Sequence, residues 1–191
     1  MADRARNAFR SEAGIRSAWP NFLIANAAAA LLCGCSANLG DLSTSSVAAY
    51  QPASLFSPNG YSVSANADGS LHVTAAGSPG TPATRLEKIA LARAAEYGDE
   101  RHAKSFKATS AQTAITCGKT KIANKDGQIN VKPLDYRVVA IDVTYEPNGQ
   151  DAGTRQTGET ANALKAELQS ETVPPEVQAA AAQEVAQYCR R

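Results

Sequence analysis

The residues of this 191-residue chain that could act in catalysis are few. His72 alternates with apolar residues of a predicted hairpin and His102 follows a predicted helix end, so we interpret both as surface residues. Neither lies at metal-ligand spacing from cysteines or carboxylates, and no serine occupies the Gly-x-Ser-x-Gly pattern of a nucleophile elbow. The sequence therefore predicts no catalytic residue, no metal ligand and no cofactor.

Arg93 and Asp142 are the two charged residues predicted to lie among apolar ones. Arg93 falls on the apolar stripe of a predicted helix, and Asp142 has apolar neighbours on both sides in a predicted strand. A charge in such surroundings needs a partner or a path to solvent. Two interpretations follow, namely a structural ion pair of Arg93 with Asp142 or Glu96, and an anion-binding pocket under the helix.

Cys35 has the most specific chemical context. Leu32-Cys33-Gly34-Cys35 resembles the lipobox of bacterial lipoproteins, in which the cysteine after Leu-x-Gly is lipidated and becomes the mature N-terminus. Cys33 fits this role less well, because bulky Leu32 precedes it where a small residue is wanted. The alternatives are a plain secretory signal cut after a small residue such as Ala37, and a cytosolic protein.

The segment that would present Cys35 has the pattern of a secretory signal. The apolar run 22–32 is too short for a hydrocarbon core, which needs roughly 20 apolar residues. We predict a lipoprotein signal peptide over 1–34, a flexible tether over 35–59 and a single domain over 60–191. By analogy with the sorting of enterobacterial lipoproteins, Ser36 rather than Asp after the cysteine implies an anchor in the outer membrane, facing the periplasm. The basic head before the run contains Arg4, Arg6, Arg10 and Arg16.

The charge balance argues against one class of partner. The whole chain has 19 basic and 18 acidic residues, and residues 1–35 contain four of the former and two of the latter. The mature chain is therefore close to neutral, whereas a nucleic-acid-binding domain needs a basic face. We predict no nucleic-acid partner, and a membrane contact through the lipid anchor.

The periodicity after Gly60 predicts an α+β domain with a mainly antiparallel sheet. Alternating residues flank Asp68-Gly69, which is typical of a hairpin, and Tyr136 to Tyr145 reads as an inner strand. Between them we predict one central helix, capped by Thr81 and ended by Gly98. Two C-terminal helices follow, at about 159–169 and from Pro174-Pro175 onward.

Part of this domain resembles a group of small, uncharacterised proteobacterial lipoproteins. The resemblance rests on Gly60-Tyr61-Ser62, a hairpin, and a helix containing Leu91-Ala92-Arg93-Ala94-Ala95-Glu96, and it covers residues 59–112. It implies an envelope lipoprotein and no particular reaction.

Cys117 and Cys189 remain if Cys33 leaves with the signal and Cys35 is acylated. An even number of cysteines in an exported domain favours a disulfide over two free thiols. We therefore predict a structural bond between Cys117 and Cys189, with separate thiols and an intermolecular bridge as the alternatives.

These observations favour a non-enzymatic envelope lipoprotein, acting as a binding or structural module. The alternative is a secreted or periplasmic enzyme with a site around Arg93 and Asp142, with His72 as a third member. A further interpretation is a subunit of an envelope assembly with a protein partner, because small residues in the Ala-rich terminal helices permit close packing.

Overall fold

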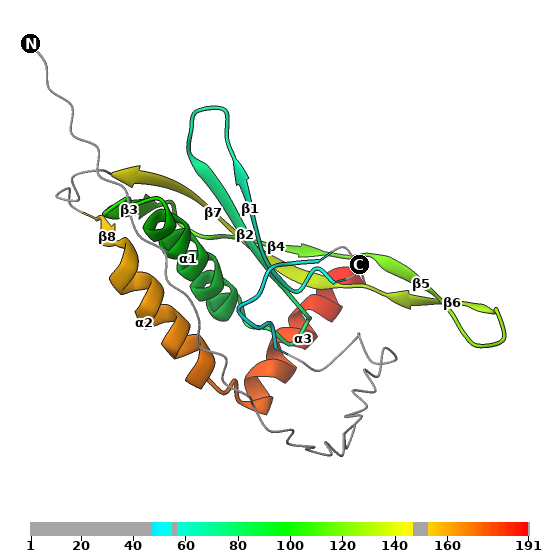
Figure 1. Ribbon diagram of the computed structural model, residues 1–191. Coiled ribbons are helices and arrows are strands. Elements are labelled where there is room, and N and C mark those ends of the chain that lie inside the picture. The colour runs from blue at the N-terminus through cyan, green and yellow to red at the C-terminus, as the bar shows by residue number, and fades with distance from the viewer. Residues whose placement is uncertain (1–46, 55–56, 147–152, 191) are drawn as a thin grey trace, which may run out of the picture. The chain divides into compact units, whose positions relative to one another are not determined.

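The computed structural model describes residues 47–54, 57–146 and 153–190 (Figure 1). The predicted signal peptide, Cys35 and the first part of the tether lie outside the described residues. The predicted α+β class with a mainly antiparallel sheet is confirmed. In chain order the elements are β1 (Gly60–Ala65), β2 (Leu71–Gly77), α1 (Ala83–Glu100), β3 (Ser105–Ala108), β4 (Gln112–Thr116), β5 (Lys119–Ala123), β6 (Ile129–Pro133), β7 (Tyr136–Glu146), β8 (Arg155–Gln156), α2 (Thr157–Ser170) and α3 (Pro175–Cys189).

Strand β7 is the centre of the sheet, as its continuous apolar sequence predicted. The strand order is β1-β2-β7-β3-β8, and β4 continues the line of β3 along the same edge of β7. Every strand pair of this sheet is antiparallel, with Val73 opposite Ile141 on one side and Ala108 opposite Val143 on the other. Strands β5 and β6 pair with each other in a separate two-stranded hairpin.

The apolar core lies between one face of the sheet and α1. Side chains alternate across a strand, so every second residue of β2 and β7 points to this face. Helix α1 supplies the facing stripe, whose many alanines let the helix approach the sheet closely. Helix α2 packs beside α1 (Figure 1). The fully buried members include Val73, Ala75, Leu86, Ile89, Ala90, Ala94, Val139 and Val143.

Helix α3 packs near the first residues of β7, where it contacts Arg137. Arg137 points to the same face as the core residues of β7, and its guanidinium donates to Glu184 Oε2 at 2.7 Å. Ala181 and Val185 are the buried apolar residues of the helix. The helix begins at Pro175, with Pro174 as its N-cap residue, as the Pro-Pro pair predicted.

Gly98 does not end the central helix, which continues to Glu100. A Cβ atom at Gly98 would lie 2.5 Å from Tyr145 Cε1 and 2.7 Å from Thr157 Cγ2. The glycine is therefore needed because two other elements approach the helix there. His102, with φ of 59°, takes the left-handed conformation after the helix instead.

Thr81 does not cap the helix either. The N-cap residue is Pro82, and no side chain caps the first turn. Thr81 is fully buried, and its hydroxyl accepts the Ala48 N–H at 3.1 Å. This threonine holds a segment that lies 33 residues earlier in the chain.

Residues 47–54, which precede the predicted boundary at Gly60, are hydrogen-bonded to the domain. Ala48 is 2% exposed, and its carbonyl accepts the Nε–H of Arg85 at 2.8 Å. Gln51 O accepts the Tyr61 N–H, and the Ala53 N–H donates to Tyr61 O, both at 2.8 Å. The described part of the predicted tether is therefore held against the domain.

Candidate functional site

A disulfide joins Cys117 and Cys189, which confirms the predicted pair. The Cα atoms lie 5.5 Å apart, within the range that a disulfide permits. Cys117 follows β4 and Cys189 is the last residue of α3. The bond therefore ties the final helix to the edge of the sheet.

Arg93 lies on α1 and its guanidinium pairs with two carboxylates of the same helix. Its Nη1 is 2.8 Å from Glu96 Oε2 and 2.9 Å from Glu100 Oε1. The guanidinium also lies over the rings of Tyr61 and Tyr97, with 5.4 Å to each centroid. Glu96 is thus the partner among the two that the sequence suggested, and the cation is already occupied by protein groups.

Glu96 is the centre of a polar network that connects three segments. It accepts the hydroxyl of Tyr50 at 2.5 Å and the ammonium of Lys165 at 2.7 Å, in addition to Arg93. Burial by itself would raise the pKa of Glu96, but these three donors outweigh it and lower the pKa to about 2. Burial and the hydrogen bond to Glu96 raise the pKa of Tyr50. The network fixes Tyr50, and with it the segment 47–54, on α1 and α2.

Replacing Glu96 with glutamine should destabilise the domain in a pH-dependent way. The folded pKa of Glu96 lies below its ordinary value of 4.5, so its stabilising effect is present above pH 4.5 and lost as the pH falls toward 2. We expect Glu96→Gln to lower the free energy of unfolding by about 2–3 kcal/mol at pH 7 and by much less at pH 2. Urea denaturation at both pH values measures the effect.

Glu87→Gln, on the same helix but outside this network, is the matched control. A difference between wild type and Glu96→Gln that is the same at pH 7 and pH 2 would contradict the assignment.

Asp142 lies on the opposite face of the sheet from Arg93, so these two predicted residues do not share a site. Its neighbours Ile141 and Val143 point into the core, and alternation directs Asp142 away from α1. Its partner is His72 on β2, with 2.7 Å between Nδ1 and Oδ1. The hydrogen bond from His72 lowers the pKa of Asp142. Of the two partners that the sequence left open for Arg93, the structure therefore shows Glu96, and Asp142 pairs with His72 instead.

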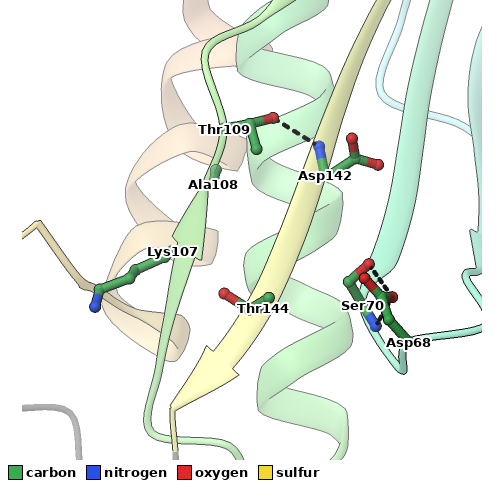
Figure 2. Close-up of a pocket in the computed structure, with 7 residues that line it drawn as sticks. All are labelled: Asp68, Ser70, Lys107, Ala108, Thr109, Asp142 and Thr144. Atoms are coloured by element: carbon green, nitrogen blue, oxygen red, sulfur yellow. Dashed lines mark hydrogen bonds between the residues drawn. The ribbon is translucent and has the colours of Figure 1, made fainter.

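This outer face of the sheet is the surface that carries the candidate site. Its residues on β2 and β7 are partly exposed, in alternation with fully buried core residues, and no described helix covers them. A depression of about 290 Å³ opens on it where β3 gives way to β4 (Figure 2). Its lining residues are Asp68, Ser70, Lys107, Ala108, Thr109, Asp142 and Thr144.

The depression lies beside an irregularity in the strand pairing, where residues 109–111 stand opposite only Ile141 and Asp142 of β7. Thr109 lies between β3 and β4, where its N–H donates to Asp142 O at 2.9 Å and its hydroxyl accepts the Asp142 N–H at 3.0 Å (Figure 2). The β1–β2 turn supplies the opposite wall. There Asp68 Oδ1 accepts from both the N–H and the hydroxyl of Ser70, at 2.9 and 2.6 Å, which lowers the pKa of Asp68.

The arrangement is suited to binding rather than to nucleophilic catalysis. Asp68 and Asp142 offer ionised carboxylates, Lys107 an ammonium, and Thr109 and Thr144 hydroxyls. The Ser70 hydroxyl is held by Asp68 and Asn66, and among the described hydrogen bonds none joins it to His72. Sequence reasoning singled out Asp142 and missed Asp68, Ser70 and Thr109. The only signal for Asp68 and Ser70 was their position in or beside the predicted Asp68-Gly69 turn.

Comparison of the chain with protein-family models, with curated proteins and with solved structures gave no match. Among the described residues, no helix has both the length and the apolar character that crossing a bilayer requires.

Proposed function

We propose that this chain is an exported bacterial envelope lipoprotein whose domain acts as a non-enzymatic binding or structural module. Acyl chains on Cys35 would anchor it in the outer membrane, facing the periplasm. The observation that carries the proposal is the Cys117–Cys189 disulfide. Disulfides persist in oxidising compartments such as the bacterial periplasm and are rare in the cytosol.

The proposal accounts for all four cysteines. Cys33 would leave with the signal peptide, Cys35 would be acylated, and the other two form the disulfide. The resemblance of residues 59–112 to small proteobacterial lipoproteins supports the same assignment.

A binding role is supported by the outer face of the sheet. Its depression presents both signs of charge and several hydroxyls, which suits a polar partner or ligand. The alternative enzyme would need Arg93 and Asp142 in one site, and they point to opposite sides of the sheet. The near-neutral charge of the mature chain argues against a nucleic-acid partner.

Metabolic labelling with palmitate tests the anchor. We expect the wild-type protein to incorporate label, Cys35→Ser to incorporate none, and Cys33→Ser to remain labelled. Intact-mass analysis of the protein purified from the envelope should show loss of residues 1–34, added acyl chains and an intact disulfide. An unlabelled wild-type protein would overturn the proposal.

The binding surface is tested separately. Thr144→Arg fills the depression with a bulky cation at an exposed position, and Gln183→Arg adds the same charge on the exposed side of α3. A partner recovered from detergent-solubilised envelopes with wild type should be lost with Thr144→Arg and kept with Gln183→Arg. Equal recovery with all three would place the binding surface elsewhere.

A further inference from the structure

The β5–β6 hairpin contributes nothing to the apolar core. Its strands pair with each other, through Lys121 opposite Val131 and Ala123 opposite Ile129, and Gly127 at φ 74° completes the turn. Almost all of its residues are exposed, and the two strands extend beyond the helices (Figure 1). A two-stranded hairpin without a packed face has little stability of its own.

The hairpin nevertheless exposes large apolar side chains. Ile129 is 65% exposed and Val131 57% exposed. Residues directly opposite each other in an antiparallel pair share one face. Ile129 and Val131 therefore lie on one face together with two lysines, and we call this the hairpin face; its residues are Lys119, Lys121, Ala123, Ile129, Val131 and Pro133.

The base of the hairpin is firmly held. Gly118 O accepts the Leu134 N–H at 2.9 Å, and the Gly118 N–H donates to Asp135 Oδ1 at 3.3 Å. The disulfide at Cys117 lies directly before this base and ties it to α3. The domain thus holds in place an element that serves no packing purpose within it.

The charge of the hairpin points to an anionic occupant. Lys119, Lys121, Lys125 and Lys132 lie in or beside its strands, against the single acidic residue Asp126. Lysines along an edge oppose pairing with a second copy of the same hairpin. Aliphatic tips beside lysines, on one face, suit an interface in which phosphates bind ammonium groups and acyl chains cover the aliphatic groups.

The attachment of the chain brings such a surface within reach. Because Ala48 is buried and hydrogen-bonded within the domain, at most the residues 36–47 separate this fixed point from Cys35, and that length of chain fully extended spans about 45 Å. In this respect the inference rests on the proposed lipid anchor. A domain on so short a connection stays near the bilayer that holds its acyl chains.

We propose that the hairpin face docks on an anionic bilayer surface. Lys119 and Lys121 bind lipid phosphates, while Ile129 and Val131 enter the boundary between headgroups and acyl chains. Docking would orient the domain on the membrane. The depression on the outer sheet face, beside Asp142 and Thr144 near the last residues of β7, would stay open to a partner.

A single indole placed on the hairpin tests the docking. The full chain with Trp19→Phe receives Val131→Trp on the hairpin face, or Asn130→Trp on the opposite face of the same strand as the matched control. With phosphatidylglycerol vesicles we expect a blue shift and quenching by brominated acyl chains for Val131→Trp. Asn130→Trp, and vesicles of phosphatidylcholine alone, should show neither effect.

The lysines are tested in the Val131→Trp background. An ammonium near an anionic surface contributes about 1 kcal/mol, so Lys119→Gln with Lys121→Gln should reduce the ratio of docked to undocked indole about 30-fold. Lys104→Gln, at an exposed position between α1 and β3, should leave that ratio unchanged.

Three results would overturn the docking. The first is a Val131→Trp indole that is not quenched on anionic vesicles, and the second is equal quenching of Val131→Trp and Asn130→Trp. The third is a blue shift of the Val131→Trp emission with polyglutamate and none with vesicles, which would assign the hairpin face to an acidic protein. Palmitate labelling separates the two proposals, because a labelled protein without quenching loses only the docking. Quenching in an unlabelled protein would overturn only the anchor.

Discussion

Replacing Cys117 and Cys189 together with serine is expected to lower the free energy of unfolding by about 4 kcal/mol. The disulfide closes a loop with a sequence separation of 72, and the chain-entropy model assigns a value of this size to such a loop. Domains of this kind are stable by only about 5–15 kcal/mol, so the loss is a large share of the total. Urea denaturation of wild type and double variant measures it.

The control is wild-type protein denatured in the presence of a reductant, which should be as unstable as the double variant. The reductant should have no effect on the double variant itself. In the double variant, the protection of backbone amides from hydrogen exchange should fall most in α3. Without the disulfide, this helix is held by Val185, Ala181 and the Arg137–Glu184 pair. A change below about 1 kcal/mol would contradict the structural role of the bond.

Replacing Arg85 with methionine is expected to cost about 3 kcal/mol. Its buried guanidinium donates to Ala48 O, to Leu168 O at 3.1 Å and to Glu171 Oε2 at 2.8 Å. Methionine fills similar space but leaves the two carbonyls without this donor, and unsatisfied buried polar groups cost about 1–3 kcal/mol each. Denaturant unfolding gives the value.

Lys88→Met is the matched control for Arg85→Met. Lys88 also pairs with Glu171, at 3.0 Å, but from a more exposed position. A surface ion pair contributes less than about 1 kcal/mol, so this variant should remain close to wild type. Because Arg85 also holds Ala48, amide exchange in residues 47–54 should accelerate in Arg85→Met and not in Lys88→Met. Equal effects of the two variants would contradict the assigned role of Arg85.

Local patterns were sufficient to predict most of the fold. The Asp-Gly turn at 68–69, the alternation around it and the apolar run of β7 are properties of neighbouring residues. Backbone geometry converts these patterns directly into a hairpin and an inner strand. The disulfide was also predictable, because counting the cysteines left one pair for the exported domain.

Gly98 and Thr81 show what local patterns leave undecided. As a glycine near the end of a helical pattern, Gly98 predicts the end of the helix. The position needs a glycine because Tyr145, which lies 47 positions later, approaches the helix there. Thr81 before a proline reads as a cap, yet its hydroxyl binds Ala48. Local preferences of about 1 kcal/mol are readily overridden by tertiary packing and buried hydrogen bonds.

The candidate site shows the same division. The alternation of apolar and polar residues was sufficient to place Asp142 on a strand. Which face of the sheet the helices cover depends on how α1 and α2 pack on β7. The depression lies beside Asp142, between Thr109 and a turn that contains Asp68, which lies 41 positions before Thr109. The sequence by itself determined the elements, since their periodicity reflects backbone geometry. Only the tertiary structure decided which side chains meet, because those contacts join residues far apart in the chain.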